Sequence, residues 1–214
     1  MTLRIHAFPA SPRAFKALAE ARHLGVDHEM RMLDLTKGEQ KQAAFTAINP
    51  NQKMPALEHC DFKLWESNAI AVYLADLKPE SGLMPADKKA RALVSQWLFW
   101  ESTTWDPPCA TLLFERFVKG FFGGGGPDTA IVEQAEAKLT AAAEILNAHV
   151  RGKRFVCGDA LCVADFALGS ALTAQELLQF PFERYAEIAR WHASLEQLPA
   201  WREVRALQQP PEAA

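Results

Sequence analysis

The fold is decided by residues 3–35, LRIHAFPASPRAFKALAEARHLGVDHEMRMLDL. Residues 3–8 predict a strand, which ends where two prolines follow. Residues 11–24 predict a helix, because polar side chains recur at spacings of three and four residues and the remaining face, apolar, is expected to be buried. The polar stripe consists of Arg13, Lys16, Glu20 and His23. With a second strand over residues 28–35, the order predicts a βαβ unit with two parallel strands.

The next segments extend this unit to about residue 80. Residues 41–48 predict a short helix that closes before Pro50, since a residue that precedes proline avoids the α region. A hairpin is predicted from residues 56–58 and 62–65, and a further helix over residues 66–77. The predicted order is therefore βαβ, helix, two strands, helix.

The second half of the chain predicts helices alone. Residues 78–87, KPESGLMPAD, lack periodicity and predict a linker. After it, helices are predicted over residues 90–120 (one long or broken helix), 128–150, 163–178, 183–198 and 200–207, with a flexible loop at 123–127. We therefore expect two domains, residues 1–79 and 88–214, which suits a chain of 214 residues.

Composition excludes several classes of function. Hydrophobic residues make up 49% and charged residues 23% of the chain, as in ordinary globular proteins. The net charge of −3 leaves no excess of cations for nucleic acid or an anionic membrane. No apolar run is long enough to span a bilayer, and the first residues do not resemble a secretory signal, so we expect a cytoplasmic protein. The four cysteines are too few and too scattered for a disulfide framework and form no CxxC motif, and we expect no metal.

Ser11 and Pro12 stand at the start of the first predicted helix. Serine is a favoured N-cap and proline is favoured at the first helical position, and taken alone these residues favour a cap and nothing more. A helix N-terminus at the carboxyl end of a strand is also a site for an anion, to which a serine hydroxyl can donate its proton. Both interpretations stay open on these residues.

Two further segments combine an ordinary structural interpretation with a binding one. Met54-Pro55 precedes a strand; an ordinary trans turn is the commoner case, whereas a cis bond would hold the Met54 backbone free to pair with an extended peptide. Glu66 and Ser67 open a helix, where capping is common but a carboxylate and an amine could also be bound.

Polar residues near the second helix and the Met54-Pro55 turn are either ordinary surface residues or ligands of an anion. Gln40, Lys41 and Lys53 are surface residues by default. Two lysines close to the turn could together hold another carboxylate.

The order and spacing of these segments closely resemble the N-terminal domain of cytosolic glutathione transferases. The segments are FPASP at 8–12, GEQKQ at 38–42, INPNQKMPAL at 48–57 and ESNAI at 66–70 followed by AVYLAD at 71–76. FPAS, the GE-x-K segment and WESTTWDPPCATLLFE at 100–115 look most like the phi class, with the beta and theta classes as neighbours. The resemblance implies a thioredoxin-like α/β domain followed by an all-α domain.

The resemblance also implies roles for the residues named above. Ser11 would donate a hydrogen bond to the sulfur of glutathione and stabilise its thiolate, which is scarce at neutral pH because a free thiol has a pKa of about 8.5. The rest of the tripeptide would be held at the glycine carboxylate by Gln40, Lys41 and Lys53, at the cysteinyl backbone by Met54 and Pro55, and at the γ-glutamyl end by Glu66 and Ser67.

The predicted reaction is transfer of the glutathione thiolate to an apolar electrophile, as in detoxification. Its pocket is expected to include Phe8, Pro9, Trp105 and Phe114. The resemblance implies a homodimer, with Phe62 or Trp65 packing against the partner. Peroxide reduction, dehalogenation or isomerisation on the same scaffold is the first alternative, and a noncatalytic ligand-binding or interaction protein is the second.

Three positions depart from the family pattern. The turn at His59-Cys60-Asp61 lacks the usual glycine, which predicts backbone strain. Cys162 stands where a serine or threonine usually caps a buried helix three residues before Asp165, which predicts a loss of about 1 kcal/mol of stability. Gln40 stands where a basic residue is usual, which predicts modest affinity for glutathione.

Overall fold

The computed structural model describes residues 3–208 and divides the chain into two compact units. Within the described residues, the first unit comprises 3–86 together with 196–208, and the second comprises 87–195. The division near residue 86 falls inside the predicted linker. The end of the chain differs from the expected second domain, because its last helix, α11 (Pro199–Ala206), packs on α1 (Pro12–His23) of the first unit.

The first unit is built on a four-stranded sheet in the order β2-β1-β3-β4. Its strands are β1 (Leu3–Ala7), β2 (His28–Met32), β3 (Ala56–His59) and β4 (Phe62–Trp65). β1 and β2 are parallel, which confirms the predicted βαβ unit, whereas β3 is antiparallel to both of its neighbours. The turn between β3 and β4 places Cys60 at a φ of 60°, in the left-handed region, as predicted for a turn without glycine.

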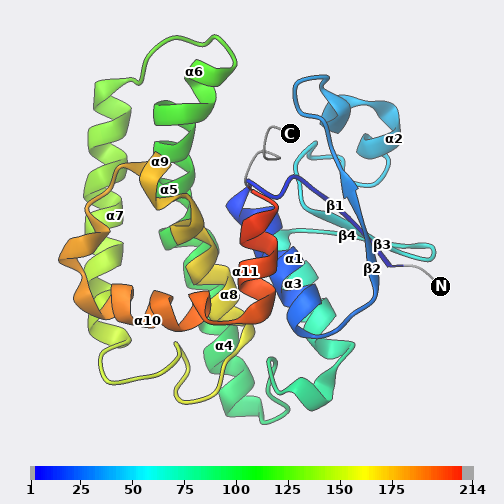
Figure 1. Ribbon diagram of the computed structural model, residues 1–214, viewed down its shortest axis with the longest axis vertical. Coiled ribbons are helices and arrows are strands. Elements are labelled where there is room, and N and C mark those ends of the chain that lie inside the picture. Colours follow the sequence, from blue (N-terminus) through cyan, green and yellow to red (C-terminus); the bar gives the residue numbers. More distant parts are fainter. Residues whose placement is uncertain (1–2, 209–214) are drawn as a thin grey trace. The chain divides into compact units, whose positions relative to one another are not determined.

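Helices cover both faces of this sheet (Figure 1). α1 and α3 (Ser67–Asp76) lie on one side, and α2 (Ala43–Thr46), preceded by the 3-10 turn η1 (Glu39–Lys41), lies on the other. Alternation along β1 explains the two layers: Leu3, Ile5 and Ala7 are buried, while Arg4 and His6 occupy the positions between them. A short turn, η2 (Pro79–Ser81), completes the unit before the linker ends.

The polar stripe predicted for α1 is only partly at the surface. Lys16 and Glu20 are 1% and 0% exposed, in contrast to the expected solvent-facing stripe. α1 contacts α3 and also α11, where the rings of Phe15 and Trp201 meet edge to face at 4.7 Å. A helix covered on several sides has too little free surface to keep all its polar positions in water.

The second unit is helical, and its long first helix is interrupted twice by π-helical turns. Its elements are α4 (Lys88–Trp100), η3 (Glu101–Trp105, π), α5 (Asp106–Leu113), η4 (Phe114–Val118, π), α6 (Lys119–Phe121), α7 (Thr129–His149), α8 (Val163–Ser170), η5 (Ala171–Ala174), α9 (Gln175–Leu178), η6 (Phe182–Arg184) and α10 (Ala186–Glu196). The helix predicted over residues 163–178 is therefore two α-helices joined by a 3-10 turn. Asp87 and Asp128 cap α4 and α7 with their carboxylates.

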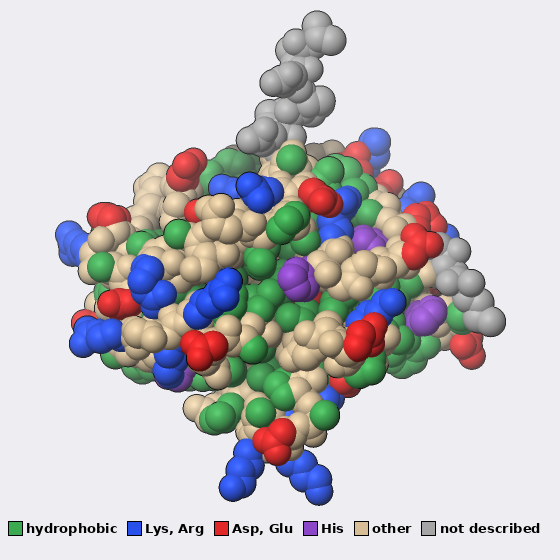
Figure 2. Space-filling view, turned by 60° about the horizontal axis from the view of Figure 1, so that its bottom comes forward, with side chains coloured by type: hydrophobic (Ala, Val, Ile, Leu, Met, Phe, Trp, Pro, Cys, Tyr) green, Lys and Arg blue, Asp and Glu red, His purple; other side chains and the backbone are tan. Residues whose placement is uncertain are grey.

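The surface carries both signs of charge. In the face shown in Figure 2, Lys and Arg side chains and Asp and Glu side chains both occur across the surface, between apolar side chains. From residue 3 to residue 208, no helix has the length and apolar character that crossing a bilayer demands.

Candidate active site

Four segments of the first unit meet at one edge of its sheet. Because β1 and β2 are parallel, both end at this edge, with Ala7 beside Met32. β3 begins there and β4 ends there, since His6 pairs with Ala56 and Ala56 pairs with Trp65. The loops that carry the predicted glutathione-binding residues all leave or enter the sheet at this edge, so the topology gathers residues from positions 11 to 67.

Ser11 stands at the N-terminus of α1, directly beyond the end of β1. Its backbone has extended geometry, its amide donates to Phe8 O at 2.9 Å, and its carbonyl accepts from the Phe15 amide at 2.8 Å. Ser11 occupies the N-cap position, but its hydroxyl makes no cap hydrogen bond, in contrast to the capping role that its residue type favours. Within residues 3–208 this hydroxyl has no protein partner and is free to donate to a ligand.

The turn before β3 contains the cis peptide bond Met54-Pro55. Met54 is half-buried and packs against a small apolar cluster made by Leu33, Phe45 and Ala56. Extending the β1–β3 register by two residues places Met54 opposite Phe8, next to the start of α1. The Met54 backbone therefore lies at the sheet edge, beyond the last ladder pair, where an extended peptide can be added.

Lys41 and Lys53 lie on the loops that flank α2, and both side chains are exposed. In the described part of the chain neither ammonium has an ion-pair partner, so both cations remain available to an anion. Gln40 is half-buried, and its Oε1 is a buried atom with no hydrogen-bond partner within the described chain. These are the three residues predicted to hold a carboxylate.

Asn49 organises the loop that presents Lys53. It is 3% exposed, its Nδ2 donates to Lys53 O at 2.5 Å, and its Oδ1 accepts from the amide of Asn51 at 3.0 Å. The sequence interpretation used Asn49 only as the residue before Pro50 and missed this role. An asparagine between a short helix and a turn is a recognisable signal, because its side chain commonly bonds to backbone a few residues away.

A second polar anchor precedes this loop. Asp34 accepts from the hydroxyl of Thr36 at 2.6 Å and pairs with Lys37 at 2.9 Å, while its amide donates to Glu39. The Thr36 hydroxyl first, and then Lys37, hold the pKa of Asp34 well below its usual range. The exit from β2 is thereby fixed by local contacts.

Glu66 and Ser67 follow β4 at the same edge. The backbone of Glu66 has a φ of 72°, in the left-handed region that residues other than glycine rarely adopt. The Glu66 side chain is exposed. Glu66 makes no side-chain cap hydrogen bond to the first turn of α3, whereas Asn68 in that turn accepts from the Lys16 ammonium of α1 at 2.9 Å. Strained backbone of this kind clusters at binding sites, because it fixes the direction in which amide groups point.

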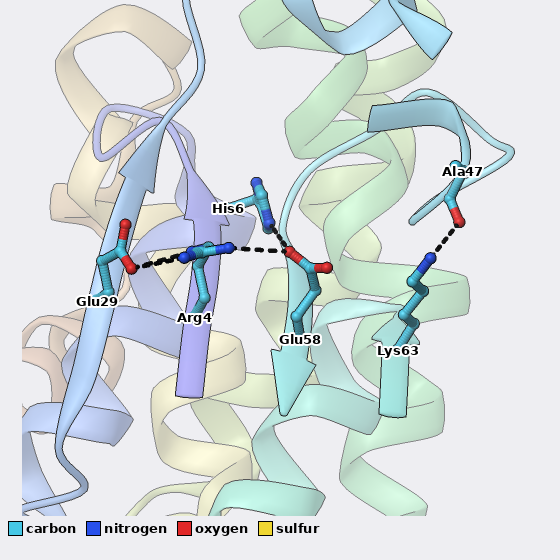
Figure 3. A network of polar contacts seen from close by, with 6 residues as sticks. All are labelled: Arg4, His6, Glu29, Ala47, Glu58 and Lys63. Atoms are coloured by element: carbon cyan, nitrogen blue, oxygen red, sulfur yellow. Dashed lines mark hydrogen bonds and ion pairs between the residues drawn. The ribbon is translucent and has the colours of Figure 1, made fainter. Parts of the chain in front are cut away.

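The face of the sheet under α2 carries a charged network (Figure 3). Arg4 lies between Glu29 at 2.9 Å and Glu58 at 3.7 Å, and His6 Nε2 lies 2.6 Å from Glu58. The His6 ring also meets Phe45 of α2, with ring centroids 5.7 Å apart. Across the sheet, Lys63 donates to Ala47 O at the end of α2 at 3.1 Å. These contacts hold the segment that carries Gln40 and Lys41 against the sheet.

The residues predicted for the second substrate divide between buried and exposed positions. In the first unit, Phe8 is half-buried and Pro9 is buried, with its carbonyl accepting from Gln208 at 2.9 Å. In the second unit, Phe114 is 50% exposed. Trp105 is 0% exposed and donates from Nε1 to Leu168 O at 3.0 Å. Trp105 belongs to the core of the second unit, and its assignment to the substrate pocket is corrected.

The second unit also has a groove of about 440 Å³ along α5 and α7. Its lining includes Thr103, Pro107, Thr111, Ile131, Lys138 and Ile145. None of the residues predicted for the second substrate is among its lining residues. Within the described residues, no group of three or more His, Cys, Asp or Glu could hold a metal ion.

A thioredoxin-like four-stranded sheet flanked by helices, followed by a helical unit, is the architecture of the glutathione transferases. Residues 1–76 match the family model of the glutathione S-transferase N-terminal domain, and residues 107–199 match that of the C-terminal domain. The chain belongs to the glutathione S-transferase family.

Individual relatives agree with this assignment. The chain is 32% identical over 213 residues to glutathione S-transferase D7 of Drosophila melanogaster, covering 97% of this chain and 91% of that protein. It resembles the crystal structure of glutathione transferase F7 from Populus trichocarpa with a TM-score of 0.88 and 26% identity, covering 97% and 100% of the two chains.

A third similarity is to the fold alone. A family member from Pseudomonas fluorescens Pf-5, solved with two glutathione molecules bound, has a TM-score of 0.85 at 22% identity and covers 95% of this chain and 92% of that one.

Proposed function

We propose that this protein is a serine-type glutathione transferase in which Ser11 stabilises the thiolate of bound glutathione for attack on an apolar electrophile. The observation that carries the proposal is the Ser11 hydroxyl, which is held at the N-terminus of α1 and makes no bond to the protein. A donor already in place costs no reorganisation when charge develops on sulfur. The positive end of the helix dipole acts in the same direction.

The tripeptide would lie along the sheet edge. The Met54 backbone would pair with the cysteinyl residue in the manner of an added strand, which places its sulfur towards Ser11. Lys41 and Lys53, with Gln40 as a neutral hydrogen-bonding partner, would hold the glycine carboxylate. Glu66 and Ser67, in the strained turn before α3, would hold the amine and carboxylate of the γ-glutamyl end.

The chemistry then needs no covalent bond to the protein. The bound thiol loses its proton to solvent, and the thiolate sulfur forms a bond to the electrophilic atom. In a substitution the leaving group then departs, and in an addition the adduct takes up a proton from solvent. The protein contributes a lowered thiol pKa and proximity of the two reactants. Phe8 and Phe114 are the residues we assign to the electrophile, each having ring surface accessible within its own unit.

The finer assignments rest on the same motifs. The phi class is supported by FPAS and the GE-x-K segment. A homodimer is supported by the exposed rings of Phe62 and Trp65, which are 43% and 39% accessible on β4. The family resemblance is what supports the proposal of a detoxifying role in the cytoplasm.

Ultraviolet difference absorbance of bound glutathione across pH tests the proposal, because it detects the thiolate without any choice of electrophile. We expect the bound thiol to titrate clearly below the free value of about 8.5. Tight binding with no thiolate at neutral pH would instead support a noncatalytic glutathione carrier. Peroxide reduction, dehalogenation and isomerisation share the thiolate, and turnover with one substrate of each kind separates them from conjugation.

A further inference from the structure

The buried carboxylate of Asp165 gathers several donors in the second unit. Asp165 is 0% exposed and lies in the first turn of α8. Its Oδ1 accepts from the Val156 amide and from Trp191 Nε1, both at 2.8 Å. Its Oδ2 accepts from the Cys162 amide at 3.0 Å and from the Cys162 thiol at 3.2 Å. The carboxylate thus connects the loop before α8 to α10.

The same arrangement brings two cysteines together. The amides of Val156 and Cys162 bind the two oxygens of one carboxylate, so Cys157, the next residue after Val156, is held close to Cys162. Residues 155–158 form a tight turn, in which Phe155 and Gly158 exchange backbone hydrogen bonds of 2.8 and 3.1 Å. Each of these two thiols perturbs the pKa of the other, as side chains in close proximity do.

The two thiols differ in environment. Cys157 is half-buried at the tip of the turn, whereas Cys162 is 3% exposed. The hydrogen bond from Cys162 lowers the pKa of Cys157, and the same contact together with burial raises the pKa of Cys162. Cys157 is therefore the thiol that reacts first with a reagent from solvent, and Cys162 is the buried thiol that reacts second.

We propose that Cys157 and Cys162 form an oxidisable dithiol, which hydrogen peroxide closes to an intrachain disulfide. The Cys157 thiolate attacks one oxygen of the peroxide, forming a sulfenic acid and releasing hydroxide. The Cys162 thiol then attacks that sulfur, a sulfur–sulfur bond forms, and the hydroxyl leaves with the thiol proton as water. Two thiols are oxidised by two electrons and one peroxide is reduced to two waters.

Formation of the disulfide changes the set of hydrogen bonds that Asp165 accepts. The Cys162 thiol has one proton and two acceptors beside it, the Cys157 sulfur and Asp165 Oδ2. The disulfide removes this donor from a buried carboxylate, leaving the two amides and Trp191 in place.

Trypsin offers a direct test. Cleavage after Arg154 and Arg184 releases residues 155–184 as one peptide that contains both cysteines, while Cys60 and Cys109 fall in other peptides. The intact reduced protein is treated with hydrogen peroxide, alkylated and digested. We expect the 155–184 peptide to lose about 2 Da, to resist alkylation at both sulfurs, and to recover with dithiothreitol.

The Cys162→Ser variant is the matched control, because serine keeps a hydroxyl donor beside Asp165. In it, Cys157 should take up oxygen atoms and no peptide should lose two hydrogens. The proposal is overturned if the wild-type 155–184 peptide stays fully alkylatable while Cys60 is oxidised. It is also overturned if Cys157 gains the same oxygen adducts in both proteins, since Cys162 would then take no part.

Discussion

Lys16 and Glu20 lie one helical turn apart on α1, and both side chains are almost completely buried. The Lys16 ammonium donates to Asn68 Oδ1 of α3 at 2.9 Å. Both carboxylate oxygens of Glu20 are buried without a hydrogen-bond partner in the described chain. Burial raises the pKa of Glu20 well above its usual value, and the charge of Lys16 opposes this only in part.

This carboxyl makes stability depend on pH. Because the pKa of Glu20 is higher in the folded than in the unfolded chain, its contribution is complete below the unfolded pKa of about 4.3 and is lost as pH rises through the folded pKa. Glu20→Gln should remove this loss, so the melting temperature of the variant should exceed that of the wild type above neutral pH and approach it at acid pH. Melting curves across pH measure this, with the exposed Glu144→Gln as control. Parallel curves for the wild type and Glu20→Gln would show that Glu20 keeps its ordinary pKa.

Ser11→Ala separates a catalytic hydroxyl from a structural one. Loss of one donor to the thiolate should lower conjugation at neutral pH by about 10- to 1,000-fold. Since the hydroxyl makes no cap bond, the free energy of unfolding should change by less than about 0.5 kcal/mol. Conjugation rates and denaturant unfolding are measured on the same preparation. An unchanged rate with about 1 kcal/mol of lost stability would restore the cap interpretation.

Phe45→Ala tests how the glutathione loop is anchored. Phe45 is 3% exposed and joins Leu33 and Ala56 beneath α2. Its truncation should cost about 3–5 kcal/mol of stability. At a temperature where the variant is folded, the KM for glutathione should rise more than kcat falls, because Gln40 and Lys41 lie on the loosened segment. The matched control is Phe182→Ala in the second unit, where the ring is also buried; an equal rise in KM there would indicate a general loss of stability.

Asp165→Ala should be severely destabilising, because it leaves the Val156 and Cys162 amides and the Trp191 indole without their acceptor. We expect a loss of at least about 3 kcal/mol, whereas Trp191→Phe, which removes one of these hydrogen bonds to a buried carboxylate, should lose about 1.5–3 kcal/mol. Denaturant unfolding of both variants measures the difference. Equal losses would mean that the indole bond carries the whole contribution of Asp165.

Strand and helix order could be predicted from the sequence because hydrophobic periodicity is a local property. The βαβ unit, the hairpin of β3 and β4 and the helices on either side were predicted close to their observed bounds. The edge residues could be named because their motifs occur in a fixed order along the chain. Boundaries were less accurate in the second unit, where two π-helical turns interrupt the first helix; Pro107 and Pro108 follow the first of them, but the predicted range of 90–120 placed neither interruption.

Burial could not be predicted in the same way, since it depends on which elements pack together. Trp105 is a large aromatic residue of the kind that lines apolar pockets, but its indole donates to the carbonyl of Leu168, which is 63 residues further along the chain. Cys162 and Asp165 were linked by their spacing, whereas the approach of Cys157 depends on the turn at residues 155–158.

The sequence by itself determined the family, the order of elements and the residue types at the sheet edge, because these follow from local periodicity and motif order. Only the tertiary structure decided that the Ser11 hydroxyl caps nothing, that Met54-Pro55 is cis, and that α11 covers α1. The physical reason is that free donors and buried charges are set by neighbours far away in sequence. Glu20 shows this most clearly, because a position in a polar stripe became a carboxyl with no access to water once α3 and α11 packed on α1.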